Sequence, residues 1–272
     1  MTRSRFLRVR IALAATALLL VAAGWAAPSA LADDPPAPPG TPTAHTIDGL
    51  KTVGPLFRNG LTNKHGCTAS VVASPFGNLI LTAAHCVSGT AAGWLFAPGY
   101  DAGATPYGVW TVTHAFVDPS WISSQDPHHD YAFLQVASQK VNGRRATLQS
   151  VTGGNLLGFA PFSRQRITDV AYNSGVNDRA ISCTVPVYYN QGYPSFNCHG
   201  YVGGSSGSPW LASIPGSSVS FVDGVIGGLH QGGCFEYTSD SSPFGADTLR
   251  LLLRASFGVH PNTVPQAGSD GC

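Results

Sequence analysis

Three residues whose side chains together could perform nucleophilic catalysis are spread over the chain in distinct local settings. Ser206 lies in the glycine-rich stretch GGSSGSPW (203–210), His85 follows the apolar run of LTAAHCV, and Asp130 opens the apolar run of HHDYAFLQV. A serine hydroxyl is a weak nucleophile at neutral pH, so it needs a histidine to take its proton and an acid to orient that histidine. These residues therefore predict hydrolysis through a triad of His85, Asp130 and Ser206.

The segments that must position these residues are predicted to be β-strands. They are short, rich in β-branched or aromatic residues, and bounded by Gly, Pro, Ser or Asn. The predicted strands are CTASVVAS (67–74), GNLILTAA (77–84), GVWTVTHAFV (108–117), DYAFLQVA (130–137) and SFVDGVIGGL (220–229). The helices that parallel sheets require between strands are missing, which favours an all-β fold.

One helix is predicted near the C-terminus, in ADTLRLLLRASF (246–257). Leu249, Leu252, Leu253 and Phe257 recur there at helical spacing. Such spacing places apolar side chains on one face of a helix. We therefore expect this face to pack against the β-structure.

Residues 1–32 are predicted to be a cleaved signal peptide, so we expect a secreted, extracellular protein. Four arginines precede an apolar run over residues 11–23, and the sequence Ala-Leu-Ala at 30–32 offers a small-residue cleavage site. The run is shorter than the ~20 apolar residues that a spanning helix needs, so we expect no stable membrane anchor. A proline-rich linker or short pro-segment (33–51), a peptidase-sized folded region (52–260) and a C-terminal tail (261–272) follow.

The composition excludes some classes of partner. Without the four arginines of the signal, the formal net charge falls from +1 to about −3, and nothing resembles the basic patch of a nucleic-acid-binding protein. Charged residues make up 11% of the chain, well below the ~25% of an average domain. The six cysteines contain no C-x-x-C pair, so in an oxidising compartment we expect disulfides, with no metal and no cofactor. We also expect a monomer.

The segments TAAHC, DYAFL and GSSGSP, in the order His, Asp, Ser, resemble the chymotrypsin-like (trypsin-fold) serine peptidases over roughly residues 52–258. Asp130 follows His85 by 45 residues, and Ser206 follows Asp130 by 76, a short distance similar to that of compact bacterial members. The resemblance implies two six-stranded antiparallel β-barrels with the active site between them. It also implies that protein or peptide substrates are cleaved through an acyl-enzyme.

The resemblance assigns further roles within the serine loop. It implies that the backbone N–H groups of Gly204 and Ser206 form the oxyanion hole, and glycines at 203, 204 and 207 can adopt the positive φ that such a loop needs. Ser205 stands where digestive members have an aspartate that pairs with a new N-terminus. This departure is similar to the glutamyl endopeptidase branch, and it predicts no activation by N-terminal insertion.

The disulfides and the specificity residues rest on the same resemblance. Cys67 and Cys86 match a family disulfide behind the catalytic histidine. Cys183 with Cys198 resembles a second-barrel bridge and leaves Cys234 for Cys272, whereas Cys198 with Cys234 resembles another family bridge. The resemblance places four residues in the substrate-binding region, namely Gly200 at the base of the specificity pocket, His230 against a substrate carboxylate, and Gly232 and Gly233 in the pocket wall.

Three other interpretations compete with this one. G-x-S-x-G at 203–207 fits the nucleophile elbow of an α/β-hydrolase with Ser205 as nucleophile and Asp247 and His260 as partners, but Pro209 does not suit the helix that must follow. A protease-fold protein that binds without cleaving is the second, although all three triad residues are present. The third is a metal site at 128–130, whose adjacent side chains would make a poor chelate on a strand.

Overall fold

The computed structural model describes residues 35–175 and 177–272, so the signal peptide predicted over residues 1–32 lies outside the described residues. No helix within those two ranges has the length and apolar character needed to cross a membrane.

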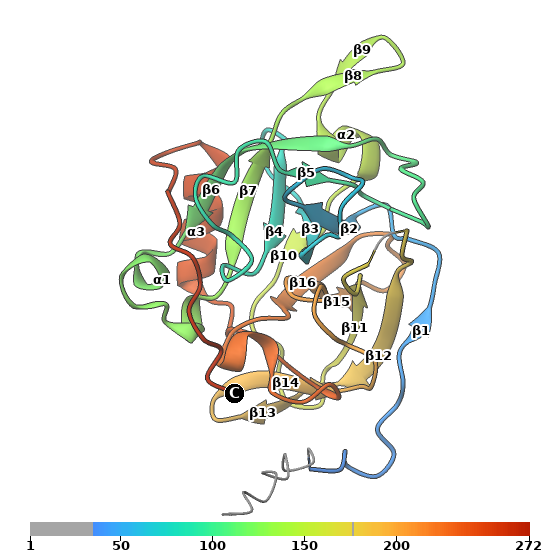
Figure 1. Cartoon of the computed structure of the whole chain (residues 1–272), viewed down its shortest axis with the longest axis vertical. Helices are drawn as coiled ribbons and strands as arrows, with labels where there is room; N and C mark the ends of the chain where they lie inside the picture. The colour runs from blue at the N-terminus through green and yellow to red at the C-terminus, as the bar shows by residue number, and fades with distance from the viewer. Residues whose placement is uncertain (1–34, 176) are drawn as a thin grey trace, which may run out of the picture. The chain divides into compact units, whose positions relative to one another are not determined.

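The first half of the described chain forms a closed antiparallel barrel, referred to below as the closed barrel (Figure 1). Its strands are β2 (Val53–Phe57), β3 (Cys67–Val72), β4 (Leu79–Thr82), β5 (Leu95–Phe96), β6 (Trp110–Val117) and β7 (Ala132–Val136), in the order β2-β3-β4-β7-β6-β5. Every residue of β2, β3 and β4 is buried. Side chains alternate between the two faces of a strand, so Ile80 joins one apolar cluster while Leu79 and Leu81 join another.

The second half of the chain, referred to below as the two-sheet half, forms two sheets rather than a second closed barrel. One sheet has the order β1-β12-β11-β15-β16-β10 and the other β13-β14-β17. The strands are β1 (His45–Thr46), β10 (Leu156–Leu157), β11 (Arg166–Ala171), β12 (Ile181–Pro186), β13 (Tyr188–Asn190), β14 (Tyr193–Asn197), β15 (Pro209–Ser213), β16 (Ser220–Val225) and β17 (Thr238–Asp240). The predicted all-β class with two barrel-like units is confirmed, and only the first unit is closed within the described residues.

An apolar cluster joins the two halves. Phe57 and Phe133 of the closed barrel pack in one cluster with Val170, Leu211 and Val222 of the two-sheet half. Strands β2, β3 and β4 are therefore covered on both faces, so all their residues are buried.

Short elements connect these sheets. They are α1 (Pro119–Ser124), the 3₁₀ helix η1 (Pro127–His129), the hairpin of β8 (Gln139–Val141) and β9 (Arg144–Ala146), α2 (Leu148–Thr152), the 3₁₀ helix η2 (Leu229–Gly232) and α3 (Ala246–Ser256). Helix α3 confirms the predicted C-terminal helix, but of the predicted apolar face only Leu252 packs against the core. Thr248, Leu251 and Ala255 are buried, whereas Leu253 and Phe257 are 51% and 62% exposed. These buried residues are three and four positions apart, so they lie on one face of the helix. The side chain of Ala255 on this face is small, which lets the helix approach the sheet closely.

Part of the segment predicted to be a linker pairs with the two-sheet half. β1 pairs antiparallel with β12, and Thr43 bridges His199. The N–H of Ala44 donates to the carbonyl of His199 (2.9 Å), and the N–H of His199 donates to the carbonyl of Pro42 (2.8 Å). These contacts involve backbone atoms alone, so no apolar periodicity in the sequence indicates them.

Candidate active site

His85 and Asp130 come from neighbouring strands of the closed barrel. His85 follows β4 and Asp130 precedes β7, and these two strands are paired. The imidazole Nδ1 lies 2.7 Å from Asp130 Oδ2, and the backbone N–H of His85 donates to Oδ1 at 2.7 Å. A carboxylate oxygen accepts, so Nδ1 carries the ring hydrogen and Nε2 keeps a lone pair for proton transfer.

The carboxylate of Asp130 is also held from the two-sheet half. The N–H of Gly228 donates to Oδ2 at 2.9 Å, and the N–H of Asp130 donates to Ser242 Oγ at 3.0 Å. A side chain on Gly227 would place its Cβ 3.1 Å from Asp130 Oδ2, so the chain passes close to the acid only because residue 227 is glycine. Asp130 is fully buried, and its three N–H donors compensate for that burial.

The loop that carries Ser206 is bonded to both halves. The N–H of Thr68 on β3 donates to the carbonyl of Ser206 (2.8 Å), and the N–H of Gly207 donates to the carbonyl of Ile226 (2.7 Å). Ser208 then donates its hydroxyl to the buried carboxylate of Asp169 at 2.8 Å. These bonds fix the loop on either side of the Ser206 hydroxyl.

Three backbone N–H groups of this loop have no acceptor within the described residues, namely those of Gly203, Gly204 and Ser206. The N–H of Ser205, between the last two, donates to the carbonyl of Val202 (3.1 Å). Gly204 has a φ of +104°, and a Cβ there would lie 2.1 Å from the backbone nitrogen of Ser174. Gly207 also has a positive φ, whereas the predicted positive φ at Gly203 is not found.

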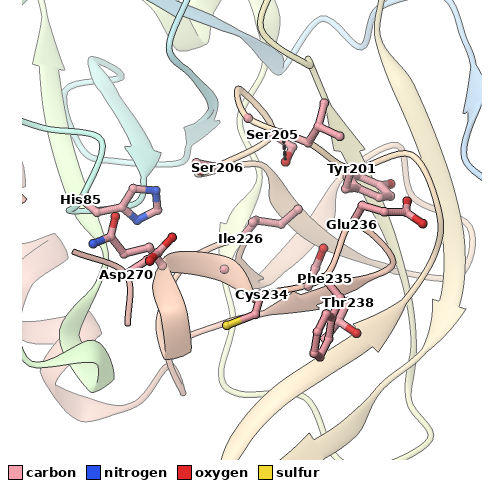
Figure 2. A pocket seen from close by; sticks show the side chains of 16 residues that line it. His85, Tyr201, Ser205, Ser206, Ile226, Cys234, Phe235, Glu236, Thr238 and Asp270 are labelled. Carbon is pink, nitrogen blue, oxygen red and sulfur yellow. Dashed lines mark hydrogen bonds between the residues drawn. The ribbon is translucent and has the colours of Figure 1, made fainter. Parts of the chain in front are cut away.

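His85 and Ser206 line one cavity of about 380 Å³ (Figure 2). Its walls come from residues 201–203 and 231–236, together with Ile226, Thr238 and Asp270. Among the described residues, the ring nitrogens of His85 contact Asp130 and Cys86, and no hydrogen bond joins them to Ser206 Oγ. Catalytic hydrogen bonds are often long in a free enzyme and tighten when substrate binds. The cavity thus brings together a hydroxyl and an imidazole paired with an acid, beside a loop with unbonded N–H groups.

The comparisons with known proteins agree with this geometry. A family model described as Trypsin matches residues 52–213. The chain belongs to the trypsin family of serine endopeptidases.

Individual relatives of this trypsin-family chain are distant. A curated extracellular metalloprotease of Bacillus subtilis (strain 168) is 32% identical over 79 residues, which are 28% of this chain and 24% of that protein. The chain thus matches about a quarter of the length of that relative. Protease Anisep from Arthrobacter nicotinovorans has a TM-score of 0.65 at 22% identity, over 79% of this chain and 100% of its own. A Glu endopeptidase in complex with MPD has a TM-score of 0.61 at 16% identity, over 80% and 98%. At these identities the two structures share the fold alone.

The α/β-hydrolase interpretation does not fit the surroundings of Ser205. Its hydroxyl donates to the carbonyl of Val202 at 2.8 Å, and the loop continues into strand β15 instead of a helix. The metal interpretation of residues 128–130 fits no better, because Asp130 contacts His85 while His128 and His129 both contact Asp126 at 3.1 Å.

The trypsin-family domain contains three disulfides, Cys67–Cys86, Cys183–Cys198 and Cys234–Cys272. The first joins β3 to the residue directly after His85. The second joins β12 to the residue after β14, so Cys198 is not available to Cys234. The third fastens the C-terminal tail to the wall of the cavity. Two groups of described His and Cys residues cluster closely enough to suggest a metal site. The cysteines of both groups are disulfide-bonded, so their sulfurs are not thiolate ligands.

Two of the four predicted substrate-binding residues line the cavity and two do not. Gly232 and Gly233 are in its wall. Gly200 lies just outside the lining, and its N–H donates to Glu236 Oε2 at 3.0 Å. His230 lines a neighbouring cavity with Trp121 and Pro127, and its Nδ1 lies 3.1 Å from the carbonyl oxygen of Asp270.

The sequence alone did not indicate the two carboxylates in the cavity wall, Glu236 and Asp270. The N–H of Gly200 and, next to it, His199 at 2.5 Å lower the pKa of Glu236. A carboxylate from a segment 36 residues away is thus brought beside Gly200. No motif marks Glu236, whereas the position of Asp270 two residues before the disulfide-bonded Cys272 could have suggested that it is held in place.

Two more carboxylates are buried behind the cavity in the two-sheet half. Burial raises the pKa of Asp240 to about 6, although Ser195 donates its hydroxyl to this carboxylate at 2.5 Å. Burial also raises the pKa of Asp169 well above its ordinary value, against the opposing effect of the hydrogen bond from Ser208. Their hydrogen-bond donors are hydroxyl groups, which do not offset the loss of water around a buried charge.

Proposed function

We propose that the chain is a secreted serine endopeptidase that hydrolyses peptide bonds with Ser206 as nucleophile, His85 as general base and Asp130 as the acid that orients it. The observation that carries this proposal is the cavity itself. Ser206 and His85 line it together, and His85 is bonded to the buried Asp130 at 2.7 Å.

The chemistry follows from the atoms that these residues present. Ser206 Oγ attacks the carbonyl carbon of the scissile bond while its proton passes to Nε2 of His85. Asp130 stabilises the imidazolium that forms. The imidazolium then gives that proton to the leaving amine, which leaves an acyl group on Ser206. A water molecule, deprotonated by His85, attacks this ester, and the acid product and the free hydroxyl result.

The free N–H groups of Gly204 and Ser206 supply the stabilisation of the oxyanion in this proposal. They flank an N–H that is already bonded, so both are available to the negative charge that develops on the carbonyl oxygen. Preorganised donors of this kind contribute about 10²–10³ in rate each. The Cβ contact at Gly204 explains why this position must be glycine for the donor to reach its place.

Protein or peptide substrates outside the cell fit this assignment. Three disulfides are typical of an oxidising compartment, and the curated relative is described as extracellular. The proposed organisation is a signal peptide over residues 1–32, a segment over 33–51, the peptidase over 52–260 and the tail over 261–272. The chemistry requires no metal or cofactor, and the proposed working form is a monomer.

The resemblance to the glutamyl endopeptidase branch adds a narrower proposal, a preference for glutamate at the cleaved position with His230 receiving its carboxylate. The similar fold of a Glu endopeptidase supports it. Two observations oppose it, because His230 lines the neighbouring cavity and Glu236 lines the cavity of Ser206. A cleavage profile without preference for Glu or Asp at that position rules this narrower proposal out.

A peptide-library digest with wild type and Ser206→Ala tests the proposed function. Removal of the nucleophile of a triad costs about 10⁶ in kcat, so we expect cleavage by the wild type and none above background by the variant. Ser205→Ala serves as the matched control, since it removes a hydroxyl from the same loop, and it keeps measurable activity. Comparable cleavage by the wild type and Ser206→Ala contradicts the proposal.

A further inference from the structure

The C-terminal tail forms part of the wall beside the catalytic base. Its last residue, Cys272, is bonded to Cys234, and the side chain of Gln231 donates to the carbonyl of Gly268 at 3.0 Å. Asp270 lies between these attachment points. Its carbonyl contacts His230, and its Oδ1 accepts the N–H of Cys272 at 3.0 Å. The carboxylate is therefore held in place on an otherwise exposed tail, with Oδ2 free.

The cavity is negatively charged at two places. Asp270 and Glu236 both line it, and its lining contains neither lysine nor arginine. Figure 2 shows Asp270 on the side of His85 and Glu236 on the far side, near Tyr201. Glu236 is already bonded to His199 and to the N–H of Gly200. Asp270 has no cationic partner among the described residues, so its charge is available to a ligand.

The position of Asp270 relates it to one residue of the substrate. Side chains of an extended peptide point alternately to opposite sides. If the cleaved residue points into the space between residues 201–203 and 232–236, the residue before it points away, toward His85 and the tail. Alternation directs both neighbours of the cleaved residue to that side, and the proposal assigns the preceding one to Asp270.

We propose that Asp270 is a specificity-determining residue that favours lysine or arginine at the position preceding the cleaved residue. This inference rests on the proposed peptidase function and deepens it. The carboxylate pairs with the substrate cation at the rim of the cavity, and the Cys234–Cys272 disulfide keeps it there. Charged pairs at a solvent-exposed rim contribute modestly to binding, so the expected preference is about three- to tenfold.

The test uses one peptide that the wild type cleaves, synthesised with Lys, Gln or Glu at the position before the cleaved residue. The measured quantity is the ratio of kcat/KM between the Lys and Gln peptides. This ratio does not depend on the fraction of folded enzyme, so a partly unfolded variant still gives an answer. We expect about three- to tenfold for the wild type, about one for Asp270→Asn, and a reversed order, Glu over Lys, for Asp270→Lys.

Asp48→Asn is the control for the change in net charge, because the Asp48 side chain is 99% exposed and its contact is with Arg179. It keeps the wild-type ratio. Salt at 1 M should bring the wild-type Lys-to-Gln ratio of kcat/KM closer to one, because salt screens an exposed charge pair. A wild-type ratio near one, or an unchanged ratio in Asp270→Asn, overturns the assignment of Asp270. If the wild type cleaves no peptide at all, with Lys, Gln or Glu at that position, the proposed peptidase function on which the assignment rests is overturned instead.

Discussion

The two halves of this trypsin-family chain differ in how they build their share of the site. The closed barrel places His85 and Asp130 at the ends of paired strands and holds them with short hydrogen bonds. The two-sheet half places Ser206 and most of the cavity wall on the loops between its strands, and the N–H groups of Gly204 and Ser206 are among those with no acceptor in the described residues. A continuous ladder of strands holds the His85–Asp130 pair, whereas the loops of the two-sheet half surround the cavity.

The two halves also differ in the hydrogen-bond donors to their buried carboxylates. Asp130 accepts three N–H groups, two from His85 and one from Gly228. Asp240 and Asp169 receive hydroxyl groups, and burial raises the pKa of both. In the two-sheet half, the effect of burial on the pKa of Asp169 and Asp240 outweighs the opposing effect of their hydroxyl donors.

The largest effect should come from breaking the pair in the closed barrel. Asp130→Asn keeps the shape of the side chain but sets an amide N–H₂ against groups that are themselves donors. We expect the histidine to lose its orientation and kcat to fall by about 10⁴. Steady-state kinetics on a cleaved peptide measures this loss.

Asp126→Asn is the matched control for that variant, because Asp126 lies four residues earlier and contacts only the outer histidines His128 and His129 by its side chain. Its effect on kcat should be no more than about twofold, as for most surface substitutions. Equal losses in Asp130→Asn and Asp126→Asn would break the comparison, since the pair with His85 would then have no special role.

Removal of two of the disulfides should affect stability equally but catalysis differently. Cys67–Cys86 and Cys183–Cys198 close loops of 19 and 15 residues, so replacing either pair by alanine should cost about 3 kcal/mol of the free energy of unfolding. Only Cys86 follows His85 directly. Small displacements of a catalytic group cost up to about 10² in rate, so only the first double variant should also lose about ten- to 100-fold in kcat.

Urea unfolding gives the stability of both double variants, and kcat is measured under conditions in which both are folded. Similar unfolding free energies with different kcat values sharpen the contrast between the halves. A kcat loss of the same size in the variant that lacks Cys183 and Cys198 shows instead that the two-sheet half positions the base as strongly as the closed barrel does.

The smallest effect concerns pH and the acid in the two-sheet half. The pKa of Asp240 is about 6 in the folded protein against an ordinary value of 3.8, so the folded state binds the proton more tightly. This group therefore contributes stability that is complete below about pH 4 and is lost as the pH rises through 6, by up to about 3 kcal/mol. Asp240→Asn should lose less stability than the wild type between pH 4 and pH 7.

Urea unfolding of wild type and Asp240→Asn across that window measures the difference, with Asp48→Asn as the exposed control. The free energy of unfolding of Asp240→Asn minus that of the wild type should increase as the pH rises from 4 to 7. The pH dependence of the control should match that of the wild type. Parallel curves for all three proteins indicate that burial of Asp240 does not influence its titration.

The sequence predicted the parts of the site that depend on local motifs. His85, Asp130 and Ser206 each lie in a short segment whose neighbours are apolar or glycine, and such segments are recognisable without knowledge of the fold. The all-β class followed from the strand patterns, and the helix 246–257 from its spacing, although its buried face did not. Tertiary packing buries Leu251 and Ala255 and leaves Leu253 and Phe257 exposed.

The parts that the sequence did not predict depend on contacts between distant segments. His230 was assigned to the pocket by a run of glycines, yet the tail holds it in the neighbouring cavity through Asp270. Glu236 reaches Gly200 from 36 residues away, and β1 joins β12 through backbone atoms only. Neither a charge nor a backbone hydrogen bond at such a separation leaves a periodic trace in the sequence.

The central claim, that Ser206 is the activated nucleophile of this chain, is tested most directly by labelling with a fluorophosphonate and locating the adduct by mass spectrometry. The probe reacts with a serine only when a base activates it. The account predicts an adduct on Ser206 in the wild type and none in His85→Ala. An adduct on Ser205, no adduct on the folded wild type, or labelling that persists in His85→Ala would contradict it.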